Sequence, residues 1–309
     1  MRWSNASRSS RRSMARSSTR SSPARSRRSR PQPAPQPASS SRTPEPLTVA
    51  GRGNLGRSLA RALHARLVPA RTGFRLPRRG LLFLAVPDGA VSEMATRIAQ
   101  MKPPAALGIV HLSGALGLDA LSALEGNPRG SFHPLQSFPM PRDRSAFQGI
   151  TVAVDATTPS LMRRLRALAR GVGAKPRHVG DEQRVLYHAA AVYASNFVDV
   201  VVAEAVRLLR GIGWTEEEAT RALLPLVEGA VANIRRRGPV EALTGPIRRG
   251  DTETVTRHLR ALDRPDLYRM LALVALEIAE EAGLDPAAAG RTKRALTRNV
   301  AATRRRGRR

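Results

Sequence analysis

The sequence predicts an α/β domain built on a parallel sheet, over residues 45–180, followed by an all-helical domain over 181–285. Three observations predict this order. Short apolar runs alternate with amphipathic stretches up to about residue 180, which is typical of alternating strands and helices. Beyond that point, helical patterns follow one another without strands between them. Glycine and proline pairs, Gly211-Ile-Gly213 and Gly238-Pro239, separate those helices.

In the first domain, continuous apolar runs are typical of strands buried on both faces of a parallel sheet. Strands are predicted at 47–51, 81–86, 107–112 and 150–154, and helices at 55–66, 90–99 and 159–170. In the second domain, helices are predicted at 181–210, 215–236, 252–262 and 264–282. Thr215, followed by three glutamates, has the composition of a helix start. The most apolar run, 197–209, is interrupted by charged residues and is predicted to be a buried helix of a soluble protein.

The net charge of +28 lies mostly at the two ends of the chain. Residues 1–44 hold eleven arginines and residues 286–309 hold nine basic residues, the first at Arg291, and neither segment has an acidic residue. The rest has 32 basic and 24 acidic residues, a net charge of only +8. We predict a Ser/Arg/Pro-rich N-terminal extension and a basic C-terminal tail without packed structure. Such an N-terminus is also typical of transit peptides, but the prolines of 31–37 would break the required helix. Nucleic-acid binding is expected only through these tails.

The composition also limits the chemistry. Cysteine is absent, which excludes disulfides, thiolate nucleophiles and cysteine-ligated metal. The six histidines are scattered, and no metal site is predicted. Because charged residues interrupt every apolar stretch of about 18 residues, we predict no membrane span and a cytoplasmic protein.

The most informative motif is a glycine turn at the end of the first strand, Gly51-Arg52-Gly53-Asn54-Leu55-Gly56. In this pattern the first glycine permits a tight turn, the second lets the backbone approach a pyrophosphate, and the third lets the helix pack closely on the strand. Main-chain amides at the helix N-terminus then bind the phosphates. The motif follows a strand and opens a helix, which predicts a Rossmann-like dinucleotide-binding domain. Val86 and Pro87, which follow the next apolar strand, are assigned to the same cofactor site.

An NADP cofactor is predicted in preference to NAD. The acidic ribose ligand expected about 20 residues after the motif is missing, because no Asp or Glu occurs between Glu45 and Asp88. That interval offers five arginines that can pair with a 2′-phosphate: Arg52, Arg71, Arg75, Arg78 and Arg79. The alternative is that these are exposed arginines in an arginine-rich chain.

Further motifs recur in an order that resembles a known family. They are Ala85-Val-Pro-Asp88, His111-Leu-Ser-Gly114, His133-Pro-Leu-Gln136, Tyr187-His-Ala-Ala-Ala191 with Ser195-Asn196, and Leu243-Thr-Gly-Pro246 with Arg249-Gly-Asp251. Together with the glycine turn, they resemble the Rossmann-like proteins whose C-terminal domain is of unknown function. These are relatives of pyrroline-5-carboxylate reductase and 6-phosphogluconate dehydrogenase. The resemblance covers about residues 47–275 and implies an NADP oxidoreductase with a helical, dimerising domain of the 6-phosphogluconate-dehydrogenase type.

One departure from that family concerns the region after the glycine turn. Only 24 residues separate Gly56 from Leu81, where the family fits a second strand, its helix and further connections. Residues 72–76 are predicted as a remnant of the second strand. The adenosine side of the pocket is therefore expected to be incomplete.

Ser113 and Gly114 follow a strand, at the position where open α/β sheets bind ligands. The resemblance implies that they contact substrate or nicotinamide, and we assign them to the cofactor site. A plain turn is the alternative. His133 and Gln136 are predicted to line the same cleft and contact substrate, although a lone histidine is more often structural.

The long helix after residue 181 carries the predicted catalytic residues His188, Ser195 and Asn196. His188 and Ser195 are two turns apart and therefore share a face. The lysine of hydroxyacid dehydrogenases is absent, because Val192 stands four residues before Asn196. We therefore expect His188, whose pKa is ordinarily near neutrality, to transfer the proton.

Thr244, Arg249 and Asp251 lie in a loop before a predicted helix. Arg249 is assigned to a substrate carboxylate, with Thr244 and Asp251 beside it. The alternative is a simple turn in which Asp251 caps the helix.

Together these features predict an NADP-dependent oxidoreductase that reduces a C=O or C=N bond of a small, carboxylated metabolite. A non-catalytic nucleotide- or metabolite-binding module is the alternative. The abundance of Ala, Val and Leu in the helical domain predicts a homodimer.

Overall fold

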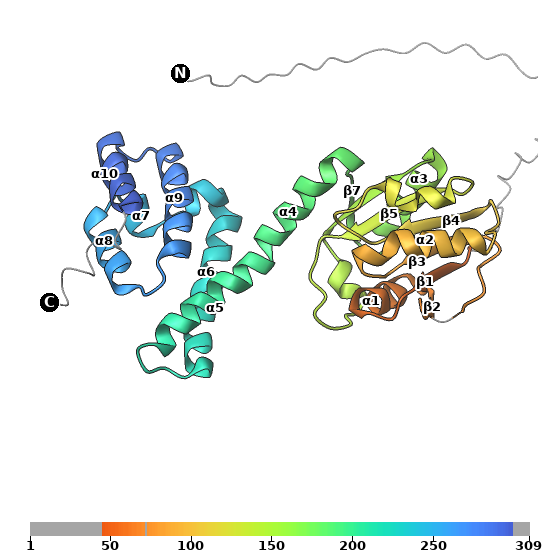
Figure 1. Ribbon diagram of the computed structural model, residues 1–309, viewed down its shortest axis with the longest axis horizontal. Coiled ribbons are helices and arrows are strands. Elements are labelled where there is room, and N and C mark those ends of the chain that lie inside the picture. Colours follow the sequence, from red (N-terminus) through yellow and green to blue (C-terminus); the bar gives the residue numbers. More distant parts are fainter. Residues whose placement is uncertain (1–44, 72, 299–309) are drawn as a thin grey trace, which may run out of the picture. The chain divides into compact units, whose positions relative to one another are not determined.

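The computed structural model describes residues 45–71 and 73–298. The predictions for residues 1–44, and for the end of the basic tail from residue 299, lie outside the described residues. The described chain begins with the alternating strands and helices of an α/β domain and continues as a series of helices (Figure 1). This is the predicted Rossmann-like domain followed by a helical C-terminal region.

The α/β domain is organised around a seven-stranded sheet in the order β2-β1-β3-β4-β5-β6-β7. The strands are β1 (Leu47–Ala50), β2 (Arg66–Val68), β3 (Gly80–Leu84), β4 (Leu107–His111), β5 (Arg129–Pro134), β6 (Thr151–Ala156) and β7 (Lys175–His178). All neighbouring strands are parallel except β5 and β6. The carboxyl ends of β1, β3 and β4 therefore meet at one edge, as required for a ligand site in an open α/β sheet.

Helices cover both faces of this sheet because successive side chains of each strand point to opposite sides. Phe83 packs on one side with residues of α1 (Asn54–Leu63) and α3 (Pro159–Gly171). Its neighbour Leu84 packs on the other side with residues of α2 (Val91–Gln100) and the 3₁₀ segment Leu118–Leu124. β3 and β4 are buried along their whole length, which explains their continuous apolar sequence.

The second strand lies at Arg66–Val68 and not in the predicted stretch 72–76, which was wrong. The reason is local: α1 ends at His64 in a left-handed conformation (φ 51°), so the chain turns at once and Leu67 pairs with Val49. The described residues between β2 and β3 contain no helix. β5 and β7 were not predicted, because their sequences lack apolar runs or clear alternation.

The C-terminal helices are α4 (Arg184–Ala194), α5 (Asn196–Arg210), α6 (Glu216–Ala242), α7 (Gly245–Arg248), α8 (Thr252–Ala261), α9 (Asp266–Glu281) and α10 (Pro286–Thr297). The predicted helix start at Thr215 is confirmed, since its hydroxyl accepts a hydrogen bond from the amide of Glu218 (3.2 Å). The predicted single helix over 181–210 is interrupted at Ser195, whose backbone is not helical (φ −129°, ψ −78°).

Residues 286–297 differ from the predicted tail, because they form α10. Ala289 and Leu296 of this helix are buried with Val255, Leu259 and Leu276 of α8 and α9. The basic residues of α10 misled the prediction: their charges face outward while small apolar residues provide the packing surface.

The segment Asp181–Arg210 contradicts the prediction of a buried helix. Only Val206 of α5 is buried, and Val198, Val200 and Val201 are exposed. By length and composition this 30-residue segment also passes as a candidate membrane span, which the sequence analysis did not predict; no part of its most apolar window is buried. Helix α6 packs along α5, but it leaves these three valines exposed.

Candidate functional site

The glycine turn is tightly packed at its two ends and open at its middle residue. Gly51 has φ +128°, and a Cβ there would lie 2.0 Å from the carbonyl oxygen of Ala85. A Cβ at Gly56 would lie 2.2 Å from the carbonyl oxygen of Gly51. At Gly53, which precedes the first residue of α1, no atom lies within 4 Å of such a Cβ. The outer glycines therefore hold the turn against β3, and the middle one faces open space in front of the helix N-terminus.

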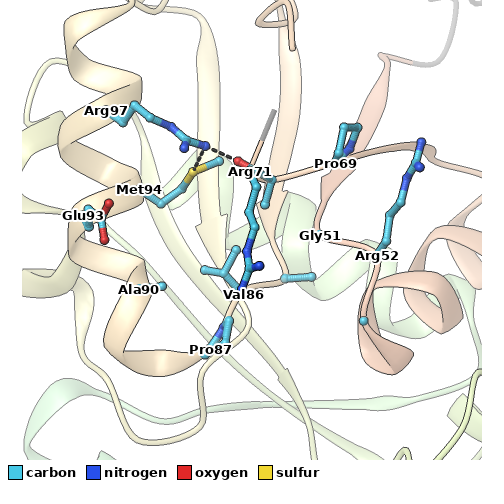
Figure 2. A pocket seen from close by; sticks show the side chains of 13 residues that line it. Gly51, Arg52, Pro69, Arg71, Val86, Pro87, Ala90, Glu93, Met94 and Arg97 are labelled. Atoms are coloured by element: carbon cyan, nitrogen blue, oxygen red, sulfur yellow. Dashed lines mark hydrogen bonds between the residues drawn. The ribbon is translucent and has the colours of Figure 1, made fainter. Parts of the chain in front are cut away.

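A cavity of about 560 Å³ opens beside this turn. Thirteen residues line it: Gly51, Arg52, Gly53, Pro69, Ala70, Arg71, Ala85, Val86, Pro87, Ala90, Glu93, Met94 and Arg97. They come from the ends of β1, β2 and β3 and from α2. Figure 2 shows Arg71 extending from the loop after β2 toward Val86 and Pro87, and Arg52 rising from the glycine turn beside Pro69.

The loop after β2 is tied to α2. Arg97 donates a hydrogen bond to the carbonyl oxygen of Ala70 and contacts the sulfur of Met94 at 2.9 Å (Figure 2). This hydrogen bond restricts the backbone next to Arg71. The position of the Arg71 side chain at the cavity is therefore restricted as well. It also compensates for the missing helix between β2 and β3, because α2 now provides the cavity wall.

A second cavity, of about 460 Å³, lies between the end of β5 and the long helical segment. Its lining residues are His133, Leu135, Gln136, Ser137, Tyr187, His188, Ala190, Ala191, Val192, Ala194, Ser195, Asn196 and Asp199. The structure thus brings together five of the predicted site residues, two from the sheet domain and three from the helices.

A hydrogen bond joins the sheet to α4 inside this cavity. The hydroxyl of Tyr187 lies 2.9 Å from Nδ1 of His133, with the two rings perpendicular. Burial, followed by the neighbouring His188 and Arg184, lowers the pKa of His133 to about 4. Burial raises the pKa of Tyr187 to about 12. At neutral pH both groups are therefore uncharged, and a phenol that donates to Nδ1 leaves Nε2–H of His133 as a donor.

Gly114 packs directly against the two histidines. A Cβ at this position would lie 2.8 Å from Nε2 of His133 and 2.9 Å from Nδ1 of His188. Only glycine lets the turn after β4 approach both rings this closely. Nδ1 of His188 is buried without a hydrogen-bond partner among the described residues, so it has unused capacity for a ligand.

Residues at and just before the start of α4 fix the turn after β4 through hydrogen bonds. Arg184, 1% exposed, donates to the carbonyl oxygen of Ser113 (3.3 Å) and to the hydroxyl of Ser131. The carboxylate of Asp181 accepts from the amide of Leu118 (3.0 Å). The hydroxyl of Ser113 accepts from the amides of Ala115 (3.1 Å) and Leu116 within the turn itself. The turn that carries Gly114 is therefore fixed at both ends by the first residues of the helical segment.

Polar side chains of β4, β5 and β6 form a row across the sheet near Arg184. His111 of β4 pairs with Ser131 of β5, which pairs with Asp155 of β6. Asp155 also lies 3.1 Å from Nε2 of His178. His111 is completely buried; burial, followed by the positive charge of Arg184, lowers its pKa to about 4. The row thus places a neutral imidazole and a carboxylate around a buried guanidinium, which needs compensating groups in this setting.

Other predicted site residues lie elsewhere. Ser113 and Gly114, assigned to the cofactor, do not line the cavity at the glycine turn and adjoin the histidines instead. Thr244, Arg249 and Asp251 line neither cavity. Asp251 caps α8 through the amide of Thr254 (3.0 Å), which is the alternative that the sequence left open. Asn54, Leu55 and Gly56 begin α1 and support the turn without lining the cavity.

Four residues of this region were missed as site residues: Tyr187, Arg184, Asp181 and Asp199. Tyr187 precedes His188 within a quoted motif, but only the fold reveals its partner on β5. Arg184 was concealed by the abundance of arginine; its signal is a position three residues before Tyr187 on an otherwise apolar helix. Over residues 45–71 and 73–298, no group of three His, Asp or Glu side chains has metal-binding geometry.

Comparison with known proteins identifies the C-terminal part. Residues 150–278 match the family described as a domain of unknown function, DUF2520. This match begins at β6, so the DUF2520 unit includes the last part of the sheet as well as the helices through most of α9. The family resemblance predicted from the motifs is confirmed. No curated protein matches the chain.

Solved structures show the same fold over most of the chain. A proposed NADP oxidoreductase from Bacteroides fragilis is 24% identical with a TM-score of 0.64, over 77% of this chain and 98% of that one. A protein from Thermotoga maritima is 22% identical with a TM-score of 0.62, over 76% and 99%. An NADP-bound pyrroline carboxylate reductase from Plasmodium falciparum is 13% identical with a TM-score of 0.53, over 81% and 99%. The chain therefore has a Rossmann-type fold followed by helices.

The buried histidines predict a specific dependence of stability on pH. His111 and His133 have pKa values of about 4 in the folded protein against 6.5 ordinarily. The unfolded chain therefore binds their protons first, and their stabilising contribution is complete above pH 6.5 and lost as the pH falls toward 4. Between pH 7 and 5 we expect a loss of about 2 kcal/mol for each histidine.

Urea unfolding at pH 7 and pH 5 measures this loss. Replacement His133→Gln should reduce the difference between the two pH values by about 2 kcal/mol, because one titrating group is removed. The same difference in the variant and the natural chain would contradict a neutral, buried His133. His64→Gln is the control, since that histidine is exposed at the end of α1 and lines neither cavity.

Proposed function

We propose that this protein is an NADP-dependent oxidoreductase that reduces a C=O or C=N bond of a small metabolite. The proposal is based on two cavities, one at each of two sheet-edge positions that the predicted motifs mark. One lies at a glycine turn whose middle residue faces open space, and the other holds neutral hydrogen-bond donors. The oxidoreductase fold of the structural neighbours supports the same reading. A carboxylate on the substrate, predicted through Arg249, is not part of the proposal, because Arg249 lines neither cavity.

The residues of the first cavity fit a dinucleotide. The amides at the start of α1 would bind the diphosphate next to Gly53, where no side chain intervenes. Arg52 and Arg71 would pair with a ribose 2′-phosphate, and the only acidic residue in the lining is Glu93 on α2. This charge distribution favours NADP over NAD. When bound, the cofactor supplies the hydride.

The second cavity supplies the polar groups that a reduced bond needs. Reduction adds a hydride to the carbon and a proton to the oxygen or nitrogen, while the dihydronicotinamide is oxidised. His188 is our candidate for the proton donor, and its buried Nδ1 lies beside Gly114. The Nε2–H of His133, with Tyr187 on its other nitrogen, would donate a hydrogen bond to the same oxygen or nitrogen. Ser195 and Asn196 would orient the rest of the substrate.

The proposal is tested by NADPH binding and oxidation. Calorimetry should show NADPH binding, and a panel of ketones and imines should include at least one compound that oxidises NADPH stoichiometrically. Replacement His188→Ala should lower kcat by about 100-fold or more while NADPH affinity stays unchanged, since His188 does not line the cofactor cavity. Absence of NADPH binding would contradict the proposal. Binding without oxidation across the panel would favour the non-catalytic module.

Cofactor preference has a separate test at Arg71. Removing this guanidinium by Arg71→Ala should weaken NADPH binding by about tenfold or more, because a hydrogen-bonded charge pair is lost. NADH affinity should stay nearly constant. The matched control is Arg75→Ala, which removes an exposed arginine of the same loop that does not line the cavity. An equal loss of NADPH and NADH affinity would show that Arg71 does not bind the 2′-phosphate.

We also propose that the protein acts as a cytoplasmic homodimer. Exposed apolar residues continue along α5 and α6, including Val201, Leu208 and Leu224, and a second copy would remove them from water. Asp199 and Glu204 within the same segment favour this partner over a lipid bilayer. Light scattering should give twice the chain mass, and Val201→Glu should shift it toward the monomer. A monomeric mass of the natural chain at micromolar concentration would contradict the dimer.

A further inference from the structure

The second cavity, which we propose to hold the substrate, has few charged side chains in its lining. Among its thirteen lining residues, Asp199 is the one acidic side chain, and burial keeps His133 neutral at pH 7. The other polar lining groups are the imidazoles, the hydroxyls of Tyr187 and Ser195, and neutral side chains such as Gln136. Within the described part of the chain, no lysine or arginine lines this cavity. A bound anion would therefore meet the carboxylate of Asp199 and no lysine or arginine.

Asp199 is free to act on a ligand. It lies in the first turn of α5, one turn beyond Ser195 and next to the predicted orienting residue Asn196. Within residues 45–71 and 73–298, no hydrogen bond or ion pair engages its carboxylate. A carboxylate in the first turn also compensates the positive end of the helix dipole, so the start of α5 offers little attraction to a second anion.

Four arginines do not change this balance. Arg207 and Arg210 line another cavity together with Asp199, but they are paired with Glu204 and Glu216. The guanidinium of Arg184 is 1% exposed and already bound to Ser113 and Ser131 behind the turn. Arg249 follows α7, which packs with α8 and α9. Neither side chain lines the cavity. A substrate carboxylate would therefore lose its hydration without gaining a cationic partner, which is unfavourable.

We propose that this cavity takes a small carbonyl compound or imine that carries a positively charged nitrogen and no carboxylate, with Asp199 as the partner of that nitrogen. The inference rests on the proposed function and names its substrate class. The hydrogen-bond donors on His133 and His188 face the bond to be reduced, and Asp199 lies at the other end of the lining, two turns or more along the helical segment from His188. Specificity then comes from repulsion of anions as well as from attraction of the cation.

The test compares two ligands of one shape and opposite charge. Cyclopentylamine, protonated at pH 7.5, and cyclopentanecarboxylate are titrated calorimetrically into the full chain, with and without saturating NADP. We expect the amine to bind about tenfold more tightly, from one attraction gained and one repulsion avoided. The preference should decrease at 0.5 M NaCl, because salt screens partly exposed charges.

Two variants identify the group responsible. Asp199→Asn should reduce the preference to about twofold or less, whereas Asp266→Asn should keep it. Asp266 is an exposed aspartate in the first turn of α9 and does not line the cavity, so it controls for total charge and for the helix-end position.

The outcomes separate the two proposals. Carboxylate binding as tight as amine binding, binding of neither ring compound, or an undiminished preference in Asp199→Asn would each overturn the substrate class. None of these results affects NADPH binding. Failure of NADPH to bind would overturn the proposed function, while the amine preference measured without NADP would still test the charge of the cavity.

Discussion

The close packing of the glycine turn against β3 is the constraint on which the rest of the structure depends. Gly51 and Gly56 have no space for a side chain, since each would place a Cβ within 2.2 Å of a carbonyl oxygen. The strand, the turn and α1 are thereby held in one geometry, with the helix amides directed at the space beside Gly53. Arg52 takes its position from this contact, whereas Arg71 is positioned by the hydrogen bond from Arg97 to Ala70.

The second half of the site depends on a different interaction, between the turn after β4 and the start of α4. Arg184 and Asp181 hold the two ends of that turn by charged hydrogen bonds, and Gly114 brings the turn against His133 and His188. Because Arg184 is buried, removing its partners would leave an uncompensated charge. The polar network therefore links the sheet to the helical segment through specific contacts. The proposed substrate cavity lies where the two meet.

The sequence predicted those features that follow from local patterns. Buried parallel strands such as β3 and β4 are apolar throughout, and the glycine spacing reports a backbone conformation, so both were recognised directly. The short strand β2 was misplaced because three residues carry no periodicity, and α10 was missed because its arginines outweighed its small apolar face. Tyr187 and Arg184 could not be found, since their partners are more than fifty residues distant. Arg249 was assigned by chemistry alone, and the fold places it outside both cavities.

The central claim is that the space in front of Gly53 receives the diphosphate of NADPH. The most direct measurement is the NADPH affinity of Gly53→Leu, with Gly126→Leu as the control, since Gly126 is equally unobstructed but lies on a remote turn. The account predicts that Gly53→Leu loses NADPH binding by at least about 100-fold while its thermal midpoint matches that of the control. Unchanged NADPH affinity in Gly53→Leu would contradict the account.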